Sequence, residues 1–199
     1  MARDFVPCAG AIRVDPSLPF PRFGQRLHLQ NPAMPRIALI SDTHGLLRPE
    51  ALAFLSGADH IVHGGDIGGP DILAQLAAIA PLSVVRGNND CEPWAANIPH
   101  ALTVTLGGVA IHAVHDIADL QLGPANVPVR VVVSGHSHKP SMVERDGVWF
   151  VNPGSAGPRR FSLPISVAEL WIDGGRVTPR LVTLAVPAVP AVPAAPGRR

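Results

Sequence analysis

Residues 36–66 read RIALISDTHGLLRPEALAFLSGADHIVHGGD, and this stretch sets the pattern from which the rest of the chain is interpreted. Residues 36–41 are a short apolar run with no polar face, as expected for a strand that is buried on both sides. Residues 49–55 follow as a helix with proline in its first turn, and residues 60–63 form a second buried strand. The stretch therefore predicts a strand, a helix and a strand, with polar or glycine residues after each strand.

The pattern continues through a second helix and then changes to strands joined by short turns. Residues 70–80 are rich in strong helix formers with an apolar spacing of about 3.6 residues, and residues 82–86 form a third strand. Dipeptides such as Asp146-Gly147 are typical of tight hairpin turns. The strands predicted beyond residue 100 span residues 101–106, 109–114, 129–134, 142–145, 148–151, 167–172 and 177–184. This order predicts a mixed α/β domain with two packed sheets.

Residues of types that can bind metal ions lie just beyond the ends of several predicted strands. They are Asp42, His44, Asp66, Asn88, His115, His136 and His138. In open α/β sheets the carboxyl ends of the strands open into the ligand crevice, so we expect these side chains to converge on one rim. Asp42 and His44 are two residues apart on an extended segment, which places both side chains on the same side, and the same holds for His136 and His138.

The chemistry of this set favours a site for two metal ions. Carboxylate, amide oxygen and imidazole donors suit borderline divalent ions, and we expect manganese, with iron, cobalt, nickel or zinc as alternatives. The set exceeds what one tetrahedral ion needs but matches two ions if one carboxylate bridges them, and Asp66 beside two glycines is the expected bridge. Taken singly, each motif is more simply a turn after a strand. The complete set in this order favours the metal site.

The two ends of the chain differ in composition from its middle. Of the 22 prolines, ten lie in residues 1–35 or 187–199, and proline at every third position favours an extended conformation over a sheet. We therefore expect a proline-rich, poorly ordered extension at residues 1–34, one folded domain at residues 35–184 and an Ala/Val/Pro-rich tail at residues 185–199.

Composition excludes several classes of protein. The 199 residues carry a formal net charge of +1, which argues against binding nucleic acid through a broad basic surface. With 47% hydrophobic and 16% charged residues, wholesale disorder is excluded. The two cysteines form no CxxC pair, so no thiolate zinc site is expected. No signal-peptide pattern and no apolar run of roughly 20 residues occurs, so we expect a cytoplasmic protein that does not associate with membranes.

The ordered motifs SDTHG, GGD, GNND, VHD, SGHSH and NPGS resemble those of the calcineurin-like metallophosphoesterases, and in particular their small bacterial and archaeal phosphodiesterase branch. The resemblance covers roughly residues 36–184. It implies a four-layer α/β/β/α sandwich of two mixed sheets, with a dinuclear centre between the strand ends. It also implies the ligands by position. Asp42, His44 and His138 would hold the first ion, Asp66 would bridge, and Asn88, His115 and His136 would hold the second.

Two positions depart from the pattern of that family. After the metal-binding Asn the family commonly has His, which assists the leaving group, or Cys in the small phosphodiesterase branch. This chain has Asn89, whose amide has no proton to give at neutral pH. Where the family often has His-Gly-His, this chain has His115-Asp116. His63, Asp90 and Arg86 are expected to support the ligands or contact the substrate.

The other histidines are expected to take no part in the metal site. His112 lies three residues before His115 on the same strand, so the two side chains should face opposite ways. His28, His60 and His100 have no motif around them and are interpreted as ordinary surface or core residues.

These features lead to the hypothesis that a small phosphoric diester is hydrolysed by in-line attack of a metal-bridging hydroxide, which Asp66 orients. Two ligand carboxylates against two divalent ions leave the centre positive, so an anionic substrate is attracted without a basic surface. Arg86, Arg159 and Arg160 are either substrate contacts or ordinary solvated side chains.

Two alternatives stay open. A phosphomonoesterase or protein phosphatase of the same superfamily is disfavoured by the small size and by the missing histidine at position 89. A non-catalytic scaffold, like the retromer subunit of this fold, is disfavoured by the complete ligand set. A homo-oligomer is compatible with either.

Overall fold

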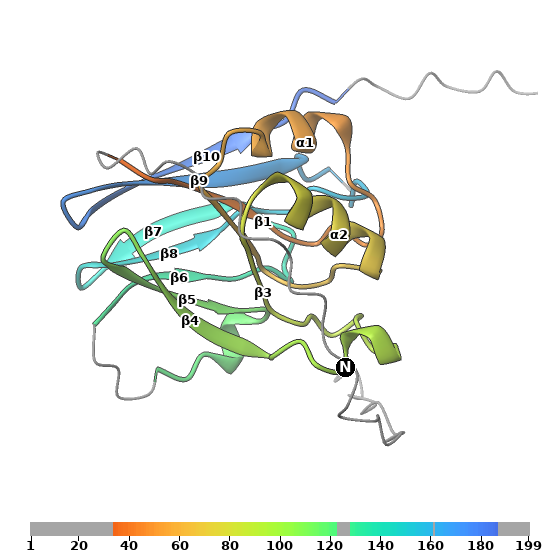
Figure 1. Cartoon of the computed structure of the whole chain (residues 1–199), viewed down its shortest axis with the longest axis horizontal. Helices are drawn as coiled ribbons and strands as arrows, with labels where there is room; N and C mark the ends of the chain where they lie inside the picture. The colour runs from red at the N-terminus through yellow and green to blue at the C-terminus, as the bar shows by residue number, and fades with distance from the viewer. Residues whose placement is uncertain (1–33, 123–127, 161, 187–199) are drawn as a thin grey trace, which may run out of the picture.

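The computed structural model describes residues 34–122, 128–160 and 162–186. The extensions predicted at residues 1–34 and 185–199 lie almost entirely outside these ranges and stay predictions. The described chain folds into two five-stranded mixed sheets packed face to face, with helices against the outer face of one of them (Figure 1). The prediction of an α/β sandwich with two mixed sheets is confirmed. Of the four layers predicted, the described residues show three, because both α-helices cover the same sheet.

The first sheet is built around β1 (Arg36–Ile40), the strand that opens the decisive stretch. β1 pairs in parallel with β2 (His60–His63), and β2 pairs in parallel with β3 (Leu82–Val84). On its other side β1 pairs antiparallel with β9 (Ser166–Asp173), which pairs antiparallel with β10 (Arg176–Thr183). The order β10-β9-β1-β2-β3 therefore brings strands from both halves of the domain into one sheet.

The second sheet comes from the middle of the chain and has the order β4-β5-β6-β8-β7. Its strands are β4 (Ala101–Leu106), β5 (Val109–Val114), β6 (Val129–Val133), β7 (Ser141–Arg145) and β8 (Val148–Asn152). β5, β6 and β8 run parallel, whereas the edge strands β4 and β7 pair antiparallel with their neighbours. The carboxyl ends of the three central strands therefore meet at one edge of the sheet.

Two α-helices cover the first sheet. α1 (Pro49–Leu55) and α2 (Pro70–Ile79) both begin with proline, as predicted, and pack their buried residues against the outer face of this sheet. The other helical segments of the described chain are the single 3-10 turns η1 (Pro93–Ala95) and η2 (Ile117–Asp119), which are too short to produce a sequence period. With no α-helix over the second sheet in the described part, its edge strand β7 keeps four of five residues exposed.

β1 shows why its sequence is apolar throughout. Ile37 and Leu39 point into the core between the sheets, whereas Ala38 and Ile40 point toward the helices, and all four are at most 1% exposed. In β5 the neighbours of His112 belong to the core between the sheets, so His112 points to the other face, as expected. No helix within the described ranges has the length and apolarity that crossing a membrane requires.

The predicted boundaries differ from the observed ones by at most two residues. The largest difference is at β3. The sequence predicts a strand over residues 82–86, whereas β3 ends at Val84. There the chain turns away from the sheet, and the backbone N–H of Arg86 donates to the carbonyl of Pro99 at 2.8 Å. This turn brings Arg86 beside the segment that leads into β4.

Candidate metal centre

The loops that follow the strands hold the candidate ligands in an unusual backbone conformation. Six non-glycine residues of the described chain have positive φ angles, and five of them are candidate ligands: Asp42, His44, Asp66, His136 and His138, with φ between 45° and 66°. The sixth, Asp146, lies in the hairpin turn between β7 and β8. Left-handed backbone is costly for residues other than glycine and gathers at functional sites. The strain is therefore confined to the rim and one tight turn.

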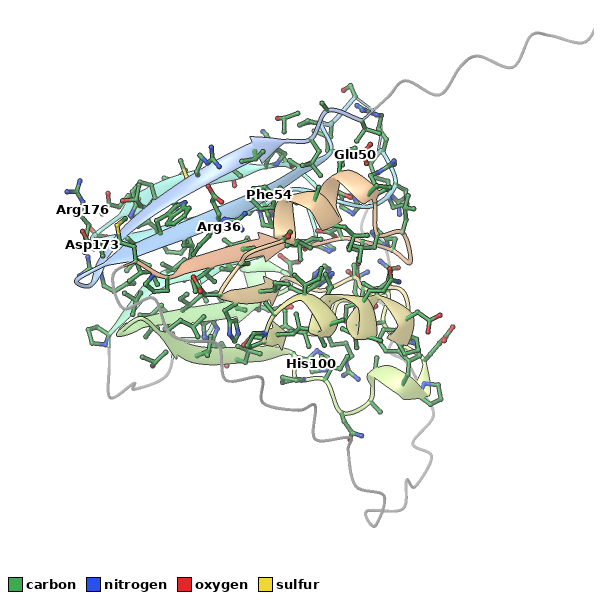
Figure 2. All side chains as sticks on the ribbon, turned by 45° about the horizontal axis from the view of Figure 1, so that its top comes forward. Arg36, Glu50, Phe54, His100, Asp173 and Arg176 are labelled. Carbon is green, nitrogen blue, oxygen red and sulfur yellow. The ribbon has the colours of Figure 1, made fainter. Side chains whose placement is uncertain are left out.

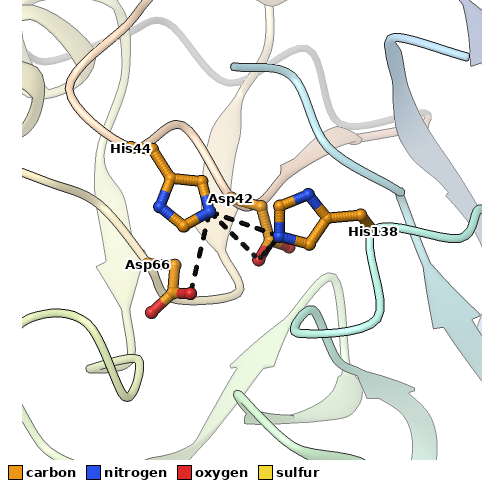
Figure 3. Close-up of side chains that lie close together, drawn as sticks. All are labelled: Asp42, His44, Asp66 and His138. Atoms are coloured by element: carbon orange, nitrogen blue, oxygen red, sulfur yellow. Dashed lines mark hydrogen bonds and ion pairs between the residues drawn. The ribbon is translucent and has the colours of Figure 1, made fainter. Parts of the chain in front are cut away.

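Asp42, His44, Asp66 and His138 converge on one point at the rim (Figure 3). One potential ligand atom from each lies within 4.8 Å of all the others. The Nε2 atoms of His44 and His138 are 3.2 Å apart, and Nε2 of His138 is 3.2 Å from Oδ1 of Asp42. Nε2 of His44 lies 3.8 Å from Oδ2 of Asp66. The four side chains thus surround a volume of the size that one ion occupies.

Asp42 provides the test of whether a cation fits there. Its side chain is fully buried, Oδ2 accepts a 2.6 Å hydrogen bond from Ser41, and Oδ1 has no hydrogen-bond partner among the described residues. Burial raises the pKa of Asp42 to about 6. A buried carboxylate oxygen left without a partner is costly unless an opposite charge is supplied. The residues present therefore fit a metal ion.

Asn88, His115 and His136 form a second group beside the first. The Oδ1 atom of Asn88 lies 3.0 Å from Nε2 of His115 and 3.0 Å from Nδ1 of His136. Nδ1 of His115 donates to the carbonyl of Gly64 at 2.7 Å, which turns Nε2 toward the rim. Of this group, His115 approaches Asp66, at the carboxylate oxygen other than the one that faces His44.

Asp66 lies between the two groups. Its Oδ1 is 3.4 Å from Nε2 of His115, and its Oδ2 faces His44. Burial would raise the pKa of Asp66, but the hydrogen bond and charge of His115 and the N–H groups of Asn89 hold it well below its usual range. Burial would also lower the pKa of His115, whereas Asp66 raises it. Asp66 is therefore ionised, and each of its two oxygens faces a different group of donors.

The side chain of Asn89 points toward Asp66, whereas a group that protonates a departing alcohol would point away from it. Its backbone N–H donates to Oδ1 of Asp66 at 2.9 Å, and its side-chain amide donates to Oδ2 at 2.6 Å. Both hydrogen bonds fix the orientation of the Asp66 carboxylate. This contact was not evident in the sequence, because it depends on the side-chain rotamer of Asn89.

His63 and Asp90 lie beneath the rim and tie its loops together. His63 is fully buried, accepts from the N–H of Gly65 at 3.1 Å through Nδ1 and donates to the hydroxyl of Thr43 at 3.0 Å through Nε2. Burial lowers the pKa of His63 to about 3, so it stays neutral. Asp90 accepts hydrogen bonds from the backbone N–H groups of Ile67, Gly68 and Gly87. The two side chains link the loops after β1, β2 and β3.

Gly65 shows how closely these loops approach the ligands. Its φ is 93°, and a Cβ atom added there would lie 2.6 Å from Nδ1 of His115. A side chain at this position would displace the imidazole, so only glycine fits.

Asn152, at the end of β8, supports the loop that carries His136 and His138. Its amide donates to the carbonyl of Gly135 at 2.6 Å and to the hydroxyl of Ser137 at 3.1 Å, and its Oδ1 accepts from Gly154. The motif NPGS contains this residue, but its spacing alone predicts no role for Asn152.

The predicted arginines lie around the centre rather than within it. Arg160 is exposed and close enough that its positive charge contributes, after burial, to lowering the pKa of His44 and His138. Burial lowers the pKa of His138 to about 4. Arg86 is half-buried and bonds to His100, which the sequence alone does not connect with the site.

Comparison with known proteins agrees with this architecture. Residues 35–175 match the sequence profile of the calcineurin-like phosphoesterase superfamily domain. A probable metallophosphoesterase of Methanothermobacter thermautotrophicus is 31% identical over 164 residues, which cover 76% of this chain and 94% of that protein.

Two solved structures show the same fold. Vacuolar Protein Sorting 29 from Cryptosporidium parvum matches with a TM-score of 0.60 and 18% identity over 75% of this chain and 97% of that chain. An archaeal phosphodiesterase matches with a TM-score of 0.58 and 20% identity over 75% of this chain and 99% of that chain. The chain therefore belongs to the calcineurin-like phosphoesterase superfamily, a family of metal-dependent enzymes that act on phosphoester bonds.

Proposed function

We propose that this protein is a phosphodiesterase that works with two divalent cations. The observation that supports it best is that Asp66 lies between two groups of nitrogen and oxygen donors, each able to complete the coordination of one ion. In the proposed arrangement Asp42, His44 and His138 would hold the first cation, Asn88, His115 and His136 would hold the second, and Asp66 would be shared by both. Imidazole and carboxylate donors suit manganese, with iron, cobalt, nickel or zinc as alternatives.

Two cations held there would supply activation of a water nucleophile and neutralisation of the phosphate oxygens. The chain itself supplies the orientation of the site. His115 is fixed by its bond to the Gly64 carbonyl, and Asp66 is fixed by both N–H groups of Asn89. Arg160 adds a positive charge on the side of His44 and His138, where it attracts the anionic ester.

The role of Asn89 favours a diester with a good leaving group. Because its amide donates to Asp66 and has no acidic proton, it does not protonate the departing alcohol. We therefore expect the rate to depend steeply on the pKa of the leaving group, with aryl diesters hydrolysed faster than alkyl diesters.

A non-catalytic scaffold is the second candidate, since Vacuolar Protein Sorting 29 shares the fold with a TM-score of 0.60. At 18% identity this likeness concerns the fold alone. The orphaned Oδ1 of Asp42 favours a metal-loaded enzyme, because a scaffold gains nothing from a buried carboxylate oxygen without a partner.

The test compares bis(p-nitrophenyl) phosphate with p-nitrophenyl phosphate, using purified protein stripped of metal and then loaded with Mn²⁺. The proposal expects the diester to be hydrolysed with the higher kcat/KM, and expects a chelator to abolish the activity. A higher kcat/KM for the monoester would favour a phosphomonoesterase. No turnover together with no Mn²⁺ binding would favour the scaffold.

A further inference from the structure

A cavity of about 850 Å³ opens beside the second group of candidate ligands. Its wall includes Asn88, His115 and His136 and continues to Arg86 and His100. This volume is that of a small-molecule pocket and exceeds what a phosphoryl group alone requires. A further part of a substrate therefore has room next to the metal centre.

Arg86 and His100 give this wall its chemistry. The Nη2 atom of Arg86 donates to Nε2 of His100, and this contact holds the guanidinium group against the wall that both residues line. Arg86 is half-buried and forms no ion pair with a carboxylate within the part of the chain that the structure describes. The pair therefore brings to the cavity a guanidinium charge that has no ion-pair partner among the described residues.

The carboxylates in the same wall are mostly engaged elsewhere. Asp90 accepts from three backbone N–H groups, and Asp116 accepts from the N–H of Ala118 and lies 3.6 Å from Nε2 of His136. Asp119 is exposed and comes from η2, a different segment from the one that carries Arg86. An anionic group is therefore attracted to the wall at Arg86 and His100 and repelled from the wall at Asp119.

We propose that Arg86 and His100 form a subsite for a second anionic group of the substrate, a phosphate or a carboxylate carried by one alcohol of the diester. The proposal rests on the proposed function, since it assigns the substrate class of the same centre. The ester phosphorus would lie at the metal centre, and the second anion would lie in the cavity against the guanidinium group. A fork of N–H donors is well suited to either anion.

The test uses p-nitrophenyl phosphodiesters that share one leaving group and differ in the second alcohol. The second substituent is ethyl, 2-carboxyethyl, 2-phosphonooxyethyl or choline, so that it is neutral, carboxylate, phosphate or cationic. With Mn²⁺-loaded protein we expect kcat/KM to be about 10-fold higher for the two anionic esters than for the ethyl ester, as an added charge-assisted hydrogen bond would give. The preferred anion identifies the source of the charge.

Arg86→Gln and His100→Ala are the test variants, and Arg176→Gln is the matched control. Figure 2 shows Arg176 beside Asp173 at the hairpin between β9 and β10, well away from His100. Both test variants should bring the ratio of anionic to ethyl ester close to one, whereas the control should keep it. A general loss of structure would lower turnover of all esters together and would not change this ratio. Binding of inorganic phosphate to the metal-free protein, followed through the ring signals of His100, gives a readout without turnover.

The outcomes separate this subsite from the proposed function. Hydrolysis of every ester with no anionic preference, or a preference for the choline ester, would overturn the subsite and leave the phosphodiesterase intact. No hydrolysis of any ester would overturn the phosphodiesterase. In that case phosphate binding decides the subsite. Unchanged His100 signals on addition of phosphate would overturn the subsite as well. Signals that shift in the control variant but not in Arg86→Gln would retain it as an anion site.

Discussion

Among the residues that the structure describes, carboxylates are buried at two places, the rim and the middle of β9, which differ in what neutralises them. Glu169, in the middle of β9, has a side chain that is 1% exposed, and its oxygens accept from Nε of Arg36 at 2.6 Å and Nε of Arg180 at 2.6 Å. Asp42 at the rim is equally buried, yet one of its oxygens has no hydrogen-bond partner and no arginine or lysine of the described residues pairs with it.

The difference between Glu169 and Asp42 separates a structural carboxylate from a candidate metal ligand. Burial would raise the pKa of Glu169, but the hydrogen bonds and charges of the arginines hold it below its usual range. Burial raises the pKa of Asp42 to about 6. Glu169 also lies in a regular strand, whereas φ at Asp42 is 53°. The fold supplies arginine side chains for Glu169 and none among the described residues for Asp42, which is the difference expected if Asp42 binds a metal ion.

Asp66→Asn should have the largest effect, because it removes the charge that both groups of ligands share. We expect turnover to fall by roughly 1000-fold, as the loss of several kcal/mol of metal-assisted stabilisation implies. Asp146→Asn is the matched control, since Asp146 also has left-handed backbone but lies in a hairpin turn. Steady-state kinetics of both variants with Mn²⁺ check this, and substantial remaining activity in Asp66→Asn would rule out the bridging assignment.

Glu169→Gln should affect stability and leave the metal centre intact. Removing one partner of a buried ion pair leaves the charge of Arg36, at 13% exposure, without a carboxylate partner, and we expect a loss of about 3 kcal/mol in the free energy of unfolding. Arg180 is 65% exposed and contributes little. Denaturant unfolding measures the loss, and calorimetry with Mn²⁺ should give unchanged stoichiometry. An altered metal count would mean that the two sites are not independent.

The pH dependence of stability has a definite sign at Glu169. Because its pKa is lower in the folded than in the unfolded protein, its contribution is fully present above the ordinary pKa of 4.5 and is lost as the pH falls through the lower folded value. Unfolding free energies of the natural protein and Glu169→Gln should therefore converge below pH 4.5. A constant difference down to the acid limit would contradict the ion-pair assignment.

His63→Ala should weaken metal binding without removing a ligand. His63 links the loops that carry Asp42 and Asp66, and the loss of such a supporting contact typically costs about 10- to 100-fold in metal affinity. His60→Ala is the control on the same strand, since His60 bonds to Ser83 instead. Titration with Mn²⁺ compares them, and equal affinities would assign His63 to the core alone.

Asn89→His should have the smallest effect and should sharpen the account of the leaving group. Histidine at this position can donate a proton, so we expect alkyl diesters to be hydrolysed about 10-fold faster, with a smaller gain for aryl diesters. The variant loses the bond to Oδ2 of Asp66 but retains the backbone bond to Oδ1. If the hydrolysis rates of the natural protein do not depend on the pKa of the leaving group, the proposed role of Asn89 is wrong.

The rim could be predicted from the sequence because its residues follow buried strands at short spacing. A candidate ligand follows each of these apolar strands. The convergence of Asp42, Asp66 and Asn88 could therefore be predicted from the rule that parallel strands end at one edge of the sheet. The Glu169 cluster could not be predicted, because Arg36 is 133 residues away and meets it only after β9 has paired with β1. The contacts of Asn89 and His100 depend on side-chain rotamers and on the early end of β3. Neither of these produces a recognisable pattern in the sequence.

The central claim is that Asp66 joins two cation sites, and counting the bound ions tests it most directly. Calorimetric titration of the metal-free protein with Mn²⁺ should saturate at two ions per chain, and Asn88→Ala should reduce the number to one while the site around Asp42 and His138 still fills. Saturation at a single ion in the natural protein, or an unchanged count in Asn88→Ala, would contradict the dinuclear centre.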